Sequence, residues 1–299
     1  MVDAQSSFTL PRRILLATDL SARSDRALDR ATQLAQQWSA GLIVVHALEE
    51  QTLTTRSSYH YEDLPSWRRP PNPASAVEEK IRRDIRDPVS DLRIVITQGD
   101  PAETILEIAE QEHCDLIVVG AARDQGLGRI NLGRTVEQLI RRAPTSVLVV
   151  KTRPSGAYRH ILVGTDFTEE ARYGLSVATH LFPDSVFAVM HAFDMPYRSL
   201  MTSSQLSQDF SAMELEEIKA HVRDADMPPQ VRVGIATLIE HGPPEHMIHR
   251  YVVEQNADLT VIGTIGRGRL FHLLIGGHAP KIVDGTPSDI LVVRAPTEK

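Results

Sequence analysis

The residues best suited to chemistry are polar side chains that directly follow short apolar runs. Asp19 and Asp166 follow one such run in each half of the chain, and a carboxylate there can accept hydrogen bonds from a nucleobase amine or a ribose hydroxyl. Each aspartate could equally cap the helix that follows it, so both interpretations stay open. His46 and His191 follow a second apolar run, where we expect each imidazole to bind a backbone carbonyl group rather than catalyse a reaction.

A glycine-rich turn late in the chain could hold an anion. Gly263-Thr264-Ile265-Gly266 is followed by nine residues and then by Gly276-Gly277. Such a turn before a helix leaves backbone N–H groups free for phosphate oxygens. Glycine also has no side chain that would block the close approach of a ligand. The same glycines could be ordinary turn residues, so this interpretation also stays open.

Other patterns that carry chemistry are weak in this sequence. His241, His246 and His249 form the closest set of histidines, but no cysteine or carboxylate cluster completes a metal shell, so no metal site is expected. The sequence contains no paired catalytic carboxylates, no Gly-x-x-x-x-Gly-Lys phosphate loop and no nucleophilic serine elbow. The single cysteine, Cys114, is expected to fill the core.

The chemically interesting residues recur because the sequence repeats itself. Four blocks return in the same order after a shift of about 145 residues, which is far above the roughly 20–50 residues of solenoid repeats. In this repeat Asp19 corresponds to Asp166 and His46 to His191. Two domains of one fold are therefore predicted, over residues 8–152 and 156–296.

Each half alternates short apolar runs with helical patterns, which is typical of an α/β fold. The strands are expected at 13–18, 42–47, 92–97, 116–119 and 147–150, and again at 160–165, 186–192, 230–236, 259–263 and 290–293. This alternation predicts two tandem, doubly wound domains, each with a five-stranded parallel sheet. Because ligands in such sheets bind beyond the carboxyl ends of the strands, the polar residues above should meet there.

Composition limits the class of protein. The chain has 299 residues, 42% hydrophobic and 24% charged, with a net charge of −7, so a general nucleic-acid-binding surface is not expected. Neither a secretory signal nor a membrane span is expected, and the cytoplasm is the predicted location. Residues 50–73, rich in proline and aromatic side chains, form a long irregular segment that we interpret as a lid or partner contact.

At this point the sequence resembles the universal stress protein family. The resemblance rests on Thr-Asp after the first strand, histidine at the end of the second, and the Gly-2x-Gly-9x-Gly loop. It implies a Rossmann-like fold of the adenine nucleotide alpha hydrolase type, with the last strands paired into an internal pseudo-dimer. It also implies that the aspartate and the residue after the strand-two histidine flank adenine, while the loop holds phosphates. The residues so implied are Asp19, Ala47, Gly120 and Gly133 in the first copy, and Asp166, Ala192, Gly263, Gly266, Gly276 and Gly277 in the second.

Both copies depart from the family's nucleotide-binding pattern. In the first, Arg123 replaces the second glycine, and Arg134 follows Gly133 where serine or threonine is usual, with Thr135 one place later. Arg123 would crowd a phosphate cradle, although either arginine could instead pair with a phosphate. In the second copy all three glycines are present and only the hydroxyl residue is missing, so we expect it to be the better nucleotide site.

The resemblance predicts a cytoplasmic, non-enzymatic stress-response module. Its expected ligand is ATP or a related small molecule, with Mg²⁺ accompanying the nucleotide, and its signal would pass through protein contacts. Pairing of whole chains into homodimers is also expected from the resemblance. Two alternatives stay open: a degenerate scaffold or lipid-binding member that holds no nucleotide, and a slow nucleotide hydrolase.

Overall fold

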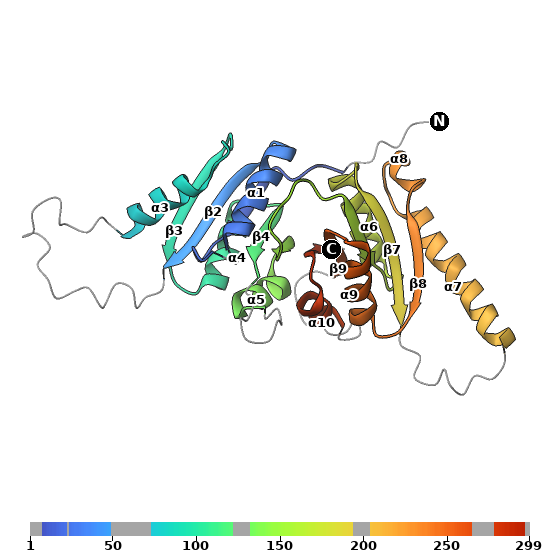
Figure 1. The fold of residues 1–299 in the computed structure, drawn as a ribbon. Helices are drawn as coiled ribbons and strands as arrows, with labels where there is room; N and C mark the ends of the chain where they lie inside the picture. Colours follow the sequence, from blue (N-terminus) through green and yellow to red (C-terminus); the bar gives the residue numbers. More distant parts are fainter. Residues whose placement is uncertain are drawn as a thin grey trace, which may run out of the picture.

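The computed structural model describes residues 8–22, 24–48, 73–121, 132–193, 204–264 and 278–296 (Figure 1). Residues 50–72 of the predicted lid segment therefore lie outside the described part of the chain. Within the described part, no helix combines the length and the apolar character needed to cross a membrane.

The first half alternates strands and helices as its sequence pattern predicts. Its elements are β1 (Arg13–Ala17), α1 (Ser24–Trp38), β2 (Gly41–Leu48), α3 (Pro73–Asp84), β3 (Leu92–Gln98), α4 (Pro101–Gln111), β4 (Leu116–Gly120), α5 (Arg134–Arg142) and β5 (Ser146–Val150). Local chemistry explains the start of α4, where the Asp100 carboxylate accepts the Ala102 N–H at 2.9 Å and the Glu103 N–H at 3.1 Å. Pro101 occupies the first turn, where no N–H is needed.

The second half follows the same order. Its elements are β6 (His160–Gly164), α6 (Glu169–Leu181), β7 (Val186–Phe193), α7 (Ser204–Asp224), α8 (Pro229–Arg232), β8 (Ala236–His241), α9 (Pro244–Gln255), β9 (Leu259–Thr264), α10 (His278–Gly285) and β10 (Asp289–Arg294).

The strand predicted at 230–236 is wrong. That segment begins with the short helix α8, and the strand starts only at Ala236. Pro228 and Pro229 explain the difference, because proline has a fixed φ and no N–H to donate, which suits the first turn of a helix and weakens a strand. Within this segment Val231 is buried, whereas Val233 is 92% exposed.

The two halves share one ten-stranded sheet of order β3-β2-β1-β4-β5-β10-β9-β6-β7-β8. Pairing is parallel within each half and antiparallel between β5 and β10. Leu148 of β5 pairs with Leu291 of β10, which is its own counterpart in the sequence repeat. A local two-fold axis therefore passes between these leucines, and the last strands join the domains as an internal pseudo-dimer.

Helices cover both faces of this sheet, and each face has its own buried core. One core contains side chains from α1, α3, α6 and α7, and the other contains side chains from α4, α5, α9 and α10. Burial on both faces explains why the central strands are continuous apolar runs rather than alternating ones. It also leaves the carboxyl ends of the strands as the place where polar residues can gather.

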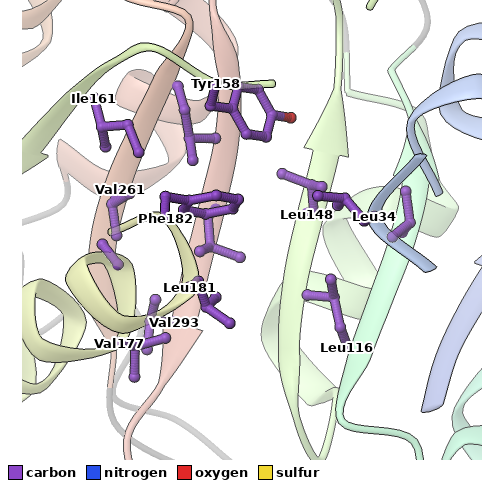
Figure 2. Packing of buried hydrophobic residues seen from close by; sticks show 14 of the residues in the cluster. Leu34, Leu116, Leu148, Tyr158, Ile161, Val177, Leu181, Phe182, Val261 and Val293 are labelled. Atoms are coloured by element: carbon purple, nitrogen blue, oxygen red, sulfur yellow. The ribbon is translucent and has the colours of Figure 1, made fainter. Parts of the chain in front are cut away.

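The cores continue across the domain boundary. Figure 2 shows Tyr158 and Phe182 of the second domain facing Leu148 and Leu34 of the first. The Tyr158 and Phe182 rings meet edge to face with centroids 5.3 Å apart, and the Trp38 indole N–H of α1 donates to the Leu181 carbonyl at 3.3 Å. The two domains are thus packed together rather than tethered.

Candidate functional site

The first domain has a cavity of about 580 Å³ at the carboxyl ends of its strands. This volume lies within the range of small-molecule sites. Its walls come from the ends of β1, β2 and β4, from the first turns of α1, α4 and α5, and from α3. The lining residues are Ala17, Thr18, Asp19, Ser24, Val45, His46, Ala47, Leu48, Val77, Pro101, Ile105, Val119, Gly120, Gly133, Thr135 and Val136.

Asp19 lies in this wall, and one of its oxygens is already committed to the local turn. Oδ1 accepts the Ser21 N–H at 2.9 Å, the Ser21 hydroxyl at 2.6 Å, and the Ser24 hydroxyl. Burial raises the pKa of Asp19, but the hydrogen bonds from Ser21 and Ser24 outweigh it and hold the pKa below its ordinary value. Asp19 is therefore an ionised acceptor, and its contacts with Ser21 and Ser24 all engage Oδ1.

Asp166 repeats this arrangement in the second domain. Its Oδ1 accepts the Thr168 N–H at 3.2 Å and the Thr168 hydroxyl at 2.5 Å. Thr168, not Asp166, is the N-cap of α6, since its hydroxyl oxygen accepts the Ala171 N–H at 3.3 Å. The aspartate thus supports the residue that caps the helix, and the simple capping interpretation does not hold for Asp166.

The two histidines near the carboxyl ends of β2 and β7 bind backbone carbonyl groups, as predicted. His46 Nδ1 lies 2.8 Å from the Thr18 carbonyl oxygen, and His191 Nδ1 lies 2.8 Å from that of Thr165. A carbonyl only accepts, so Nδ1 donates and Nε2 of a neutral ring is an acceptor. His46 lines the cavity, and Nε2 is the ring nitrogen that the Thr18 carbonyl does not engage.

The amino end of α5 supplies donors to the same cavity. Gly133 is the N-cap, and as a glycine it supplies no side-chain hydrogen bond to the amides of the first turn. Gly133 and Thr135 line the cavity, and the amino end of a helix is in general suited to an anion through its first-turn amides and its dipole. Arg134 is exposed and is not among the residues that line the cavity, whereas Thr135, one place later, does line it.

The glycines of the two copies differ in their steric role. A Cβ added to Gly133 would meet nothing within 4 Å, so the space beside it is open. A Cβ on Gly263 would lie 2.1 Å from the Glu170 carbonyl oxygen, so glycine here allows the first turn of α6 to approach β9. Close packing, rather than room for a phosphate, explains the glycine at position 263.

The structure thus brings five of the predicted site residues of the first copy around one cavity: Asp19, Ala47, Gly120, Gly133 and Thr135. In the second copy Asp166, Ala192 and Gly263 lie at the ends of β6, β7 and β9. The predicted residues Arg123, Gly266, Gly276 and Gly277 lie outside the described part of the chain. The expectation that the second copy is the better site therefore stays a prediction.

Comparison with known proteins decides the family. A sequence model of the universal stress protein family matches the chain twice, over residues 11–151 and 157–294. The chain belongs to the universal stress protein family. It carries two family domains in tandem, each an α/β unit with a parallel sheet.

Relatives match either the whole chain or one domain. A universal stress protein of Mycolicibacterium smegmatis is 23% identical over 312 residues, covering 94% of this chain and 96% of its own length. One of Thermus aquaticus is 30% identical over 148 residues, covering 47% of this chain and 98% of its own length. The crystal structure of a universal stress protein from Archaeoglobus fulgidus has a TM-score of 0.68 at 19% identity, covering 95% of this chain and 98% of the other. At that identity the structural likeness shows the fold alone.

Several lining residues escape the sequence patterns. Val77 of α3 and Ile105 of α4 complete the apolar part of the wall, but nothing in their local sequence distinguishes them from core residues. Ser24 could have been found from the sequence, because a serine in the first helical turn after Thr-Asp can donate a hydrogen bond back to the aspartate carboxylate. Within the described residues, no group of three or more histidine, cysteine, aspartate or glutamate side chains is arranged to hold a metal ion.

Proposed function

We propose that the cavity of the first domain binds an adenine nucleotide, ATP or a close relative. The observation that carries this proposal is that a helix N-terminus without a side-chain cap and an ionised aspartate form parts of one cavity wall. Phosphate oxygens would accept the first-turn amides of α5 and the Thr135 hydroxyl. Asp19 and His46 would accept hydrogen bonds from the ribose hydroxyls or the adenine amine.

The apolar walls fit the other requirement of a nucleotide, which is a place for the base. Val45, Val77, Ile105 and Val119 line the cavity and offer contact surface to a planar ring. Mg²⁺ would arrive with the phosphates, because it binds phosphate oxygens, water and few protein ligands. Asp19, together with the hydroxyl side chains of Thr18, Ser24 and Thr135 in the same wall, could supply oxygen to such an ion.

We further propose that this site binds rather than turns over its ligand. His46 already donates Nδ1 to a backbone carbonyl, and Asp19 is the one carboxylate among the residues that line the described cavity. Bound nucleotide would then act by favouring one conformation of the surrounding surface, which a protein partner reads through its differential affinity. Sustained phosphate release that disappears in Asp19→Asn would favour the slow hydrolase instead.

Isothermal titration with ATP, with and without Mg²⁺, tests the ligand. Gly133→Leu should fold, since its Cβ would meet nothing within 4 Å, and should weaken binding at least about tenfold by filling the phosphate end of the cavity. Asp19→Asn should weaken binding less, and Asp166→Asn is the matched change in the second domain. A larger loss in Asp166→Asn would place the principal site in the second copy.

A chain that gives no heat with ATP and releases no nucleotide on denaturation would refute the proposal for both domains. Mass spectrometry of small molecules released from the denatured protein would then identify any other ligand. A released lipid would support the lipid-binding alternative, and no released molecule would support the scaffold.

A further inference from the structure

The last strand of each domain ends with a cation that crosses the domain boundary. Lys151, directly after β5, donates from Nζ to the Val283 carbonyl and, at 2.7 Å, to the Thr286 carbonyl at the end of α10. Arg294, at the end of β10, donates from Nη2 to the Ile140 carbonyl in the last turn of α5 at 2.7 Å. The local two-fold axis relates these two contacts, so each domain caps the final helix of the other.

The final helix of the first domain bears on ligand binding, because it forms part of the cavity wall. α5 presents its amino end to the cavity in the first domain, while its carboxyl end is held by Arg294 of the second. A cation at the carboxyl end of a helix stabilises the helix through its last carbonyls and its dipole. The proposed phosphate-binding amides of one domain therefore lie on an element whose other end is fixed by its neighbour.

The two caps are not equally enclosed. Lys151 is 2% exposed, and the adjoining junction is filled by Arg30, Tyr158 and Asp289. The Arg30 guanidinium lies 3.9 Å from the Tyr158 ring centroid. Asp289 accepts a hydrogen bond from the Tyr158 hydroxyl at 2.7 Å.

At the Arg294 junction the counterparts of these three residues are Val177, Pro11 and Ser146, which are smaller. A groove of about 680 Å³ opens there, and Arg294 lines it. Solvent can therefore reach the surroundings of the cap on α5, whereas the cap on α10 is sealed.

We propose that Arg294 is a positioning residue for phosphate binding in the first domain, with Lys151 holding α10 in the reciprocal way. Neither α5 nor α10 is then positioned by its own domain alone. This inference rests on the proposed nucleotide site for its binding consequence, but the contact between Arg294 and α5 can be tested without any nucleotide.

Titration of ATP and adenosine into matched variants tests the binding consequence. Arg294→Gln should weaken ATP binding roughly threefold to tenfold while leaving adenosine binding unchanged, because only the phosphate end depends on α5. Arg294→Met, which keeps the apolar stem, should behave in the same way. Arg294→Lys should restore ATP binding, since a lysine performs this task at position 151. Arg250→Gln, which removes an exposed α9 arginine paired with Glu254, is the control and should change neither affinity.

Equal losses for ATP and adenosine, or no loss of ATP affinity in either Arg294→Gln or Arg294→Met, would overturn the proposal. Hydrogen exchange separates this result from failure of the nucleotide site itself. In the ligand-free protein, α5 amides should exchange faster in Arg294→Gln than in the parent chain, while α9 amides should not change. If the parent chain binds no ATP but α5 shows this effect, the nucleotide proposal fails and the cap stands; unchanged α5 exchange refutes the cap.

Discussion

Replacing Gly263 by alanine should destabilise the second domain, because the new methyl group has no space. Its Cβ would lie 2.1 Å from the Glu170 carbonyl oxygen, 2.5 Å from the Glu170 carbonyl carbon and 2.8 Å from the Ala171 nitrogen. A carbon atom normally stays about 3.3 Å or more from a carbonyl oxygen, so the first turn of α6 must retreat by roughly 1 Å. The clash is with backbone, which cannot rotate away as a side chain can.

The expected cost follows from this geometry. Overpacking a filled core costs typically about 1–3 kcal/mol, and a clash between backbone and Cβ belongs at the upper end or above it. We therefore expect Gly263→Ala to lower the free energy of unfolding by about 3 kcal/mol or more. Gly174 contacts the same point from the α6 side, where an added Cβ would lie 3.3 Å from Gly263 Cα, so Gly174→Ala should cost less.

Equilibrium denaturation followed by circular dichroism measures these differences, with Gly133→Ala as the matched control. An added Cβ at Gly133 meets nothing within 4 Å, its φ of −61° suits any residue, and loss of a favourable N-cap costs only about 1 kcal/mol. If Gly263→Ala proves no more destabilising than Gly133→Ala, the packing explanation is wrong. Gly263 would then be free to serve the phosphate role expected of it from the sequence.

Two further predictions concern buried ionisable groups. Burial lowers the pKa of His221 to about 4 in the folded protein, so the unfolded chain binds a proton first and stability falls as the pH drops from about 6.5 toward 4. The loss of unfolding free energy at pH 5 relative to pH 7.5 should be about 2 kcal/mol. A His221→Gln variant, measured by denaturation across this pH range, should show a correspondingly smaller decline. Asp289→Ala should cost about 3–5 kcal/mol, because Arg30 lies 3.7 Å from this carboxylate and the Lys151 and Thr152 N–H groups also bind it; a thermal midpoint within a degree or two of the parent chain would contradict this.

Strands with a continuous apolar run were predictable, because burial on both faces leaves an unambiguous signal. The half-buried edge strand was not. The segment 230–236 alternates valine with polar residues as a strand would, yet Pro228 and Pro229 start a helical turn and β8 begins only at Ala236. The alternation of apolar and polar residues predicts strand bounds poorly for an edge strand such as β8, which pairs with one neighbour, β7.

The candidate site was predictable where backbone geometry decides it. Asp19, Ala47 and Gly120 lie at or just after the carboxyl ends of strands that meet in any parallel sheet, and they do line one cavity. Val77 and Ile105 could not be found, because their positions depend on how α3 and α4 pack onto the sheet rather than on their own sequence. The steric reason for Gly263 was also hidden, since it lies in a contact with α6, about 90 residues away along the chain.

The tandem arrangement has a physical consequence that a dimer of identical chains could not have. In a two-fold dimer both junctions beside the axis bury the same residues, so a change on one side appears on the other. Here one junction carries Arg30, Tyr158 and Asp289, and its counterpart is an open groove beside Arg294. Because the groove admits solvent, the charge on Arg294 is screened by salt more than the buried charge of Lys151. The contact between Arg294 and α5 should therefore weaken with ionic strength, while the contact between Lys151 and α10 does not. The first domain should then be the one whose ligand affinity changes with ionic strength.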